Sequence, residues 1–210
     1  MLILFRYFIQ MKTSAPKIAT QIFRRHGGTL LTSEILRLGV HPRTLYHLRE
    51  SGKITQLSRG VYRLADLPPL ENSDLATMAK RVPAGVVCLI SALSFHEITN
   101  EIPHEVYLAI PTGKEKPKIN FPPARVFHFS PETYSPGIEE HILDEVKIKI
   151  YSKEKTIADC FKFRNRIGLD VALEALRQCV SKGCSRKKIL DFARICRVEH
   201  VIRPYIESIQ

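Results

Sequence analysis

Apolar positions recur at helical spacing in the first third of the chain. Ile18, Ile22 and Phe23 share one face of a helix predicted over Pro16–His26, which the pair Gly27-Gly28 ends. A second helix begins with Thr32 or Ser33 as its N-cap and ends at Gly39. These two helices are short, and the segment between Leu38 and His41 is the expected turn before a third.

The third helix is predicted to start near Pro42, because proline suits the first helical position, and to end at Gly52. Two strands follow, Lys53–Leu57 and Val61–Leu64, and Ser58-Arg59-Gly60 joins them as a tight hairpin. Helix, turn, helix and hairpin in this order predict a winged helix-turn-helix.

The remaining chain begins with a linker at Ala65–Asn72, which holds two prolines and has no periodicity. Alternating or continuous apolar runs then predict strands, and apolar residues at helical spacing predict helices. Pro204 is expected to kink or divide the last helix. Ser91 and Ser152 are the expected N-caps of two of these helices. The predicted elements are helix Ser73–Arg81, a strand or helix start at Val86–Ile90, a helix from Ser91 to Ile98, strands Glu105–Ile110, Arg125–Phe129 and Val146–Tyr151, and helices from Ser152 to Arg164, Leu169–Val180, Arg186–Ile195 and Val198–Ile209.

These elements predict an α+β protein: an N-terminal winged helix-turn-helix followed by a mixed α+β domain with a helical end. The boundaries are residues 16–67 for the first domain and 68–210 for the second, and residues 1–15 form an N-terminal extension. We interpret the apolar run Met1–Gln10 as an upstream start codon or a disordered extension in preference to a membrane or partner anchor, since it is too short to cross a bilayer. No other segment approaches transmembrane length, so we expect a cytoplasmic protein without a membrane partner.

Positive charge is concentrated at the N-terminal end. Residues 1–67 hold 11 Lys and Arg against 3 Asp and Glu, whereas residues 68–210 hold 21 against 18. The net charge of +8 therefore falls to +3 after the linker. This asymmetry predicts a polyanion-binding module in front of a domain with another task.

The third predicted helix has its apolar side chains and its polar side chains on different sides. At about 100° per residue, Leu45 and Leu48 centre on one side of the helix, and Arg43, Thr44 and His47 centre on another. A helix laid in the major groove needs this separation, and arginine pairs with guanine through two hydrogen bonds. We expect Arg43, Thr44 and His47 to read bases, with further contacts to bases or phosphates from Tyr46 on the flank and from Ser33, Arg49, Lys53, Arg59 and Arg63.

The stretch Gly27–Leu64 resembles the N-terminal domain of the AbiEi-type antitoxins of type IV toxin–antitoxin systems. The runs RTLYHL at Arg43–Leu48, ESGKI at Glu50–Ile54 and RGVYRL at Arg59–Leu64 carry the resemblance. The run IYSKEKTIADCFKFRNRIGLDVALEAL at Ile150–Leu176 is similar to the C-terminal part of that family. The similarity covers most of Gly27–Leu176.

The resemblance implies an autorepressor that binds inverted repeats in double-stranded DNA of its own promoter, with two copies on the DNA. It also implies an antitoxin, active against a nucleotidyltransferase-like toxin that is encoded beside it and need not form a stable complex with it. The C-terminal domain would neutralise the toxin and the winged helix would bind DNA. No enzymatic activity and no cofactor are implied.

Two other functions stay open. One is a winged-helix regulator whose second domain senses a ligand. The other is a metal-dependent nuclease, because Glu145-Val146-Lys147 has the E-x-K spacing in which a carboxylate holds a divalent metal beside a lysine. The scattered histidines do not have metal-ligand spacing, so we expect no metal site.

Three further patterns have a structural interpretation. Five cysteines without a CxxC pair predict free, buried thiols in a reducing cytosol rather than disulfides. Ser152 fits an N-cap better than a nucleophile paired with Lys155, and Asp159 and Lys162 fit solvated or ion-paired positions. A second basic cluster, either a solvated helix face or an extension of the nucleic-acid contact, consists of Lys182, Arg186, Lys187 and Lys188.

Overall fold

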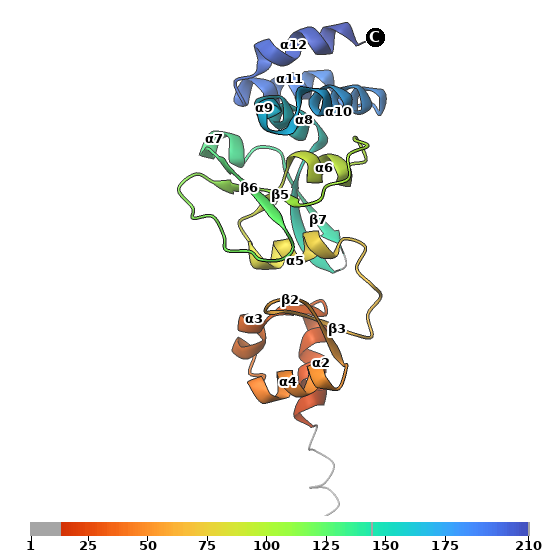
Figure 1. The fold of residues 1–210 in the computed structure, drawn as a ribbon, viewed down its shortest axis with the longest axis vertical. Helices are drawn as coiled ribbons and strands as arrows, with labels where there is room; N and C mark the ends of the chain where they lie inside the picture. Colours follow the sequence, from red (N-terminus) through yellow and green to blue (C-terminus); the bar gives the residue numbers. More distant parts are fainter. Residues whose placement is uncertain (1–13, 144, 210) are drawn as a thin grey trace, which may run out of the picture. The chain divides into compact units, whose positions relative to one another are not determined.

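The computed structural model describes residues 14–143 and 145–209. The chain divides into two compact units, which we call the N-terminal unit (residues 1–73 with 144–146) and the C-terminal unit (residues 74–143 with 147–210). Figure 1 shows the elements of both. The segment Met1–Gln10, which we interpreted from sequence as a start-codon artefact or an extension, lies outside the described residues.

The N-terminal unit has the predicted winged-helix order with one additional strand. It comprises α2 (Ala15–Arg25), β1 (Thr29–Leu31), α3 (Thr32–Arg37), α4 (Pro42–Glu50), β2 (Ile54–Ser58) and β3 (Val61–Leu64). Its sheet has the order β1-β3-β2, and both pairings are antiparallel. The strand β1 was not predicted, because three residues are too few to show alternation.

One apolar core holds this unit together. Ala19 and Phe23 of α2 pack with Ile35 of α3, Leu48 of α4 and Leu64 of β3, all of them buried. Burying a side chain of this size contributes about 1.5–3 kcal/mol relative to exposure. The unit therefore has the elements of an independently folding domain.

The turn between α3 and α4 depends on Gly39. This residue has φ 87°, in the left-handed region that favours glycine. Val40 N donates to Ile35 O, which closes the end of α3. The start of α3 differs from the prediction: Leu31 is its N-cap, Thr32 and Ser33 lie in its first turn, and Glu34 Oε2 accepts from Leu31 N.

The C-terminal unit combines a sheet with a helical end. Its elements are α5 (Ser73–Arg81), β4 (Val86–Val87), α6 (Leu89–Phe95), β5 (Val106–Pro111), β6 (Ala124–Phe129), α7 (Pro131–Tyr134), β7 (Ile138–Leu143), β8 (Val146–Tyr151), α8 (Lys153–Lys162), α9 (Arg164–Ile167), α10 (Leu169–Ser181), α11 (Arg186–Ile195) and α12 (Glu199–Ser208). The sheet order is β6-β5-β4-β8-β7. β4 pairs antiparallel with β5 and parallel with β8, and β5 pairs parallel with β6. The predicted α+β class is confirmed.

The helix α8 is the centre of the helical end. It contacts α6, α10, α11 and α12, of which Figure 1 shows the last three in blue. Ile157, Ala158 and Phe161 of α8 are fully buried in a core that also includes sheet residues such as Phe127 and Tyr151. Among residues 14–143 and 145–209, no helix has both the length and the apolar character needed to cross a membrane.

One predicted feature of this unit was wrong, and one strand was missed. The helix α6 begins at Leu89 with Cys88 as its N-cap, so Ser91 is not a cap. Its buried hydroxyl instead donates to Glu105 O and accepts from Tyr107 N, which ties α6 to β5. The strand β7 was missed, because the glutamates of its sequence IEEHIL read as an acidic cluster. Pro204 lies inside α12 and does not divide it.

Candidate nucleic-acid interface

The helix α4 presents the side chains that the sequence predicted. Pro42 occupies the first turn, and His41 caps it, since His41 Nδ1 accepts from Arg43 N at 3.1 Å. Leu45 and Leu48 are 6% and 0% exposed and face the core. Arg43 and His47 are exposed and Thr44 is half-buried. The predicted separation of the packed side from the open side of this helix is confirmed.

Tyr46 and Arg49 form a second group on the same helix. Tyr46 is 56% exposed, and the Arg49 guanidinium lies 5.2 Å from the centre of its ring. A cation–π contact of this kind holds a long arginine side chain against a rigid surface. The pair therefore presents an ordered positive charge with an aromatic face beside the open side of α4.

The hairpin between β2 and β3 turns through Arg59 and Gly60. Gly60 has φ 79°, which a tight hairpin turn requires. Gly60 O accepts hydrogen bonds from Thr32 N at 2.8 Å and from Thr32 Oγ1 at 3.3 Å. These bonds fix the turn against the start of α3, so that two exposed side chains, Arg59 and Ser33, lie in neighbouring segments.

The prediction of a phosphate contact by Arg63 is wrong. Arg63 is 7% exposed, and its guanidinium donates to Thr29 Oγ1 at 3.0 Å and to Pro68 O at 3.1 Å. The side chain therefore ties β3 to β1 and to the segment that follows the wing. These two hydrogen bonds and the burial of the side chain give Arg63 a structural role.

Lys53 is exposed and follows the last residue of α4 by three positions. It lines a groove of about 620 Å³ with Lys17 and Arg24 of α2, whose guanidinium pairs with Asp66. Sequence reasoning missed Lys17 and Arg24 as neighbours of Lys53. Their spacing of seven residues places them on one face of a helix, which was the available signal.

The second predicted basic cluster lies in the C-terminal unit, at the turn between α10 and α11. Lys182, Arg186, Lys187 and Lys188 are all exposed. The ammonium of Lys182 donates to Glu97 O. Ser185 caps α11, because its Oγ accepts from Lys188 N at 3.3 Å.

The E-x-K sequence Glu145-Val146-Lys147 leads into the strand β8, and its lysine forms an ion pair. Val146, Ile148 and Ile150 are buried and Lys147 is exposed, as expected for a half-buried strand. The Lys147 ammonium lies 2.6 Å from Glu140 Oε2, in an ion pair of modest energy. Within residues 14–143 and 145–209, no group of three or more His, Cys, Asp or Glu side chains is placed to hold a metal ion.

Ser152 is the N-cap of α8, as predicted: its Oγ accepts from Lys155 N at 3.3 Å. Lys155 itself is fully buried and pairs with Asp159. Asp159 is therefore ion-paired rather than solvated, which were the two interpretations that the sequence left open. Burial raises the pKa of Asp159, and the neighbouring Lys155 charge opposes this shift.

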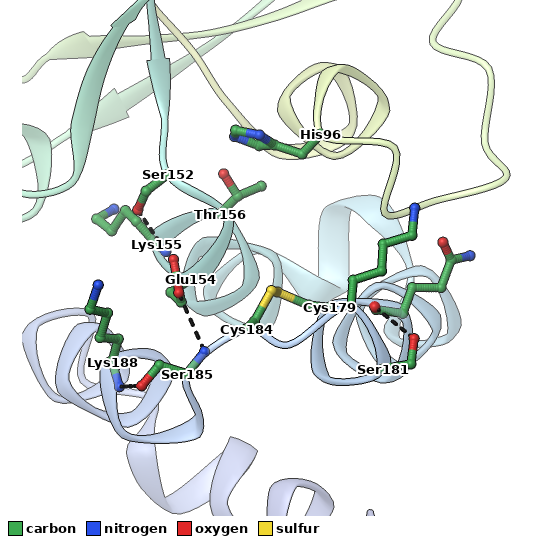
Figure 2. Close-up of a disulfide and its surroundings, with 12 residues drawn as sticks. His96, Ser152, Glu154, Lys155, Thr156, Cys179, Ser181, Cys184, Ser185 and Lys188 are labelled. Carbon is green, nitrogen blue, oxygen red and sulfur yellow. Dashed lines mark hydrogen bonds between the residues drawn. A yellow bond between two sulfur atoms is a disulfide. The ribbon is translucent and has the colours of Figure 1, made fainter.

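The expectation of five free thiols is wrong. Cys179, at the end of α10, is bonded to Cys184, which precedes α11 (Figure 2). The other three cysteines are free and buried, as expected. A separation of five residues matches no common disulfide motif, so the sequence carried no signal for this pair.

Comparisons with known proteins agree with this geometry. Residues 17–65 match the AbiEi_4 family model, described as "Transcriptional regulator, AbiEi antitoxin", which confirms the resemblance of the winged helix. A search of curated proteins found no match. The crystal structure of the RV2827C protein from Mycobacterium tuberculosis is similar in fold, with a TM-score of 0.59 and 11% identity over 93% of this chain and 81% of that chain.

Proposed function

We propose that this protein is a DNA-binding transcriptional autorepressor and the antitoxin of a type IV toxin–antitoxin system. The observation that carries the DNA-binding part is the open side of α4. It presents Arg43, Thr44 and His47 while Leu45 and Leu48 anchor the helix in the core. The family match over residues 17–65 supports the same assignment.

In this proposal α4 lies in the major groove. The Arg43 guanidinium donates two hydrogen bonds to a guanine, and Thr44 and His47 contact neighbouring bases or phosphates. Arg49, held against Tyr46, contacts the phosphate backbone. Arg59 at the hairpin turn reaches the adjacent minor groove, and Ser33 at the start of α3 donates to a phosphate. Lys53 adds a phosphate contact from the other end of α4.

The wider proposal follows the family resemblance. The DNA is an inverted repeat in the protein's own promoter, bound by two copies, and the C-terminal unit counteracts a nucleotidyltransferase-like toxin in the cytoplasm. The protein is not an enzyme in this proposal. Its distribution of charge, with most of the excess before residue 68, supports the division of tasks.

The DNA-binding part is tested by titrating the full chain into a labelled duplex from its own upstream region, with a scrambled duplex as control. We expect tighter binding to the upstream duplex, and a steep loss of affinity with salt for both. Equal affinity for the two duplexes at every salt concentration would contradict sequence-specific repression. Antitoxin function is tested separately, by co-expressing the neighbouring nucleotidyltransferase-like gene and scoring growth.

A further inference from the structure

The Cys179–Cys184 pair differs from the other cysteines in accessibility. Cys88 and Cys160 are completely buried and Cys196 is 3% exposed. Burial raises the pKa of all three thiols, that of Cys196 to about 12, so they remain protonated and unreactive. Cys184, by contrast, is partly exposed, and its partner Cys179 is buried. The chain therefore has one cysteine pair that solvent reaches from one side.

The surroundings of Cys184 are electropositive. The residue directly precedes the N-cap of α11, and the exposed side chains Arg186, Lys187 and Lys188 follow in the first turn of that helix. Positive charges and a helix N-terminus stabilise a thiolate over a thiol. One carboxylate opposes them: Glu154 Oε1 accepts from Ser185 N at 3.4 Å, as the dashed line in Figure 2 shows.

The turn that brings the two sulfur atoms together is held by backbone hydrogen bonds. Cys184 N donates to Cys179 O at 2.9 Å, and Gly183 N donates to Val180 O at 3.0 Å. Gly183 has φ 82°, a conformation that closes the end of α10. These bonds do not involve the sulfur atoms, so we expect them to keep the two cysteines adjacent after reduction.

A disulfide across so short a loop is a weak structural crosslink. The stabilisation from a crosslink grows with the number of residues in the loop that it closes, and here the separation is only five residues. Disulfides that occur in a reducing compartment are typically transient and redox-active. This second argument rests on the proposed function, which places the protein in the cytoplasm.

We infer that Cys179 and Cys184 form a thiol–disulfide exchange site whose substrate is a small-molecule disulfide. The Cys184 thiolate attacks one sulfur of the substrate, which forms a mixed disulfide and releases the first small-molecule thiolate. The Cys179 thiolate then attacks the Cys184 sulfur, forms the Cys179–Cys184 bond and releases the second. The protein pair loses two electrons, the substrate gains them, and the two protons from the cysteines end on the two released thiols.

The experiment uses the reduced full chain with glutathione disulfide as the probe, followed by acid quenching, denaturing alkylation and mass spectrometry. The five cysteines of the reduced chain should fall to three alkylated ones, and the two that are lost should be Cys179 and Cys184. Cys179→Ser should accumulate a mixed disulfide with glutathione at Cys184, because the resolving thiol is missing. Cys184→Ser should form none, because Cys179 is buried.

A matched pair of variants tests the role of charge. Arg186→Gln/Lys187→Gln/Lys188→Gln should slow the first step several-fold, about five-fold at low salt. Lys114→Gln/Lys116→Gln/Lys118→Gln removes three exposed charges elsewhere and should leave the rate unchanged. Glu154→Gln should accelerate it. Equal rates in all four proteins, the unsubstituted chain included, would overturn the activation of Cys184 by its charged surroundings, on which the inference rests.

Reversibility is the last requirement. Millimolar reduced glutathione should reopen the bond in the folded protein, with unchanged far-ultraviolet circular dichroism. A bond that resists reduction until the protein unfolds is a structural disulfide and overturns the inference. These readouts do not involve DNA, so a failure of the exchange chemistry is distinguishable from a failure of the proposed regulatory function.

Discussion

The ammonium of Lys155 lies 2.6 Å from both carboxylate oxygens of Asp159, and neither side chain has any exposure to solvent. The aromatic rings of Tyr151 and Phe129 lie 4.4 and 5.0 Å from the same ammonium. Cys196 Sγ donates to Asp159 Oδ1 from α11. The pair therefore lies where α8 meets the sheet and the C-terminal end of α11, in a region where an unpaired charge is costly.

Removing only one member of the Lys155–Asp159 pair should destabilise the protein much more than replacing both members with apolar residues. We expect Lys155→Met to lower the free energy of unfolding by about 3–5 kcal/mol, because Asp159 stays buried without its counter-charge. Lys155→Met/Asp159→Leu should recover most of this loss. Urea unfolding monitored by circular dichroism measures both. The exposed pair Lys147–Glu140 is the control, since Lys147→Met should cost less than about 1 kcal/mol. A double variant as unstable as the single one would contradict this account.

Arg43 should contribute to sequence-specific DNA binding and not only to the general attraction between the protein and the phosphates. We expect Arg43→Ala to weaken binding to the upstream duplex by about 1–3 kcal/mol and to change binding to a scrambled duplex much less. Arg177→Ala, which removes one exposed charge from α10, is the matched control. Fluorescence anisotropy at several salt concentrations separates the two effects. If specific binding by Arg43→Ala equals that of Arg177→Ala, α4 is not the reading helix.

Arg63 should behave as a structural residue although it lies in the wing. Arg63→Met removes the hydrogen bonds to Thr29 Oγ1 and Pro68 O and leaves the buried Thr29 hydroxyl without this donor. We expect a loss of about 1–3 kcal/mol in the stability of the N-terminal unit. DNA affinity measured well below the melting temperature should stay unchanged. Undiminished stability with weakened DNA binding would restore Arg63 as a phosphate contact.

His96 should make stability depend on pH. Burial lowers the pKa of His96, and the contact between its Nε2 and Tyr151 O at 2.7 Å partly opposes the shift. The folded state therefore binds a proton less readily than the unfolded one. The His96 contribution is complete above about pH 6.5, the ordinary histidine pKa, and is lost as the pH falls toward the lowered value.

The test compares the free energy of unfolding at pH 7.5 and pH 5.5. His96→Gln keeps a donor for Tyr151 O but does not titrate, so its stability should fall less over this range than that of the unsubstituted chain. His141→Gln changes a neighbouring ring and serves as the control, with the pH dependence retained. If the free energy of unfolding falls equally with pH in the unsubstituted chain and in His96→Gln, a group other than His96 causes the pH dependence.

The sequence predicted those parts of the fold in which local pattern and tertiary packing agree. Pro42, the two leucines of α4 and Gly39 each favour the same local structure, and α4 has the predicted start and orientation. The residues Ser73–Arg81 and Arg186–Ile195 form helices with the predicted bounds. Periodicity is informative in α4 and α11 because the buried side chains of each helix lie on one face.

The missed features depend on partners distant in sequence. Arg63 reads as an exposed cation until its acceptors, 34 residues before it and 5 residues after it, are placed beside it. Ser91 reads as an N-cap until its hydroxyl meets β5. The Cys179–Cys184 bond depends on the geometry of one turn. Local pattern contains none of this information.

The boundary between the two units also differs from the sequence prediction, and it sets the design of a truncation. The N-terminal unit extends to Ser73 rather than Leu67, and Pro68 O accepts from the buried Arg63. We expect a fragment of residues 1–73 to fold and to bind the upstream duplex, since the apolar core of α2, α3, α4 and the wing lies within it. A fragment that ends at Leu67 should be less stable by about 1–2 kcal/mol, because it lacks that acceptor.

The same fragment separates repression from toxin neutralisation. If the C-terminal unit counteracts the proposed toxin, residues 1–73 should bind DNA but fail to restore growth when the toxin gene proposed to lie beside this one is expressed. The full chain carrying Arg43→Ala is the reciprocal control and should restore growth with weakened DNA binding, provided that the toxin is expressed from an unrelated promoter. Growth restored by the fragment alone would contradict the division of tasks, since the residues that neutralise the toxin would then lie within the winged helix.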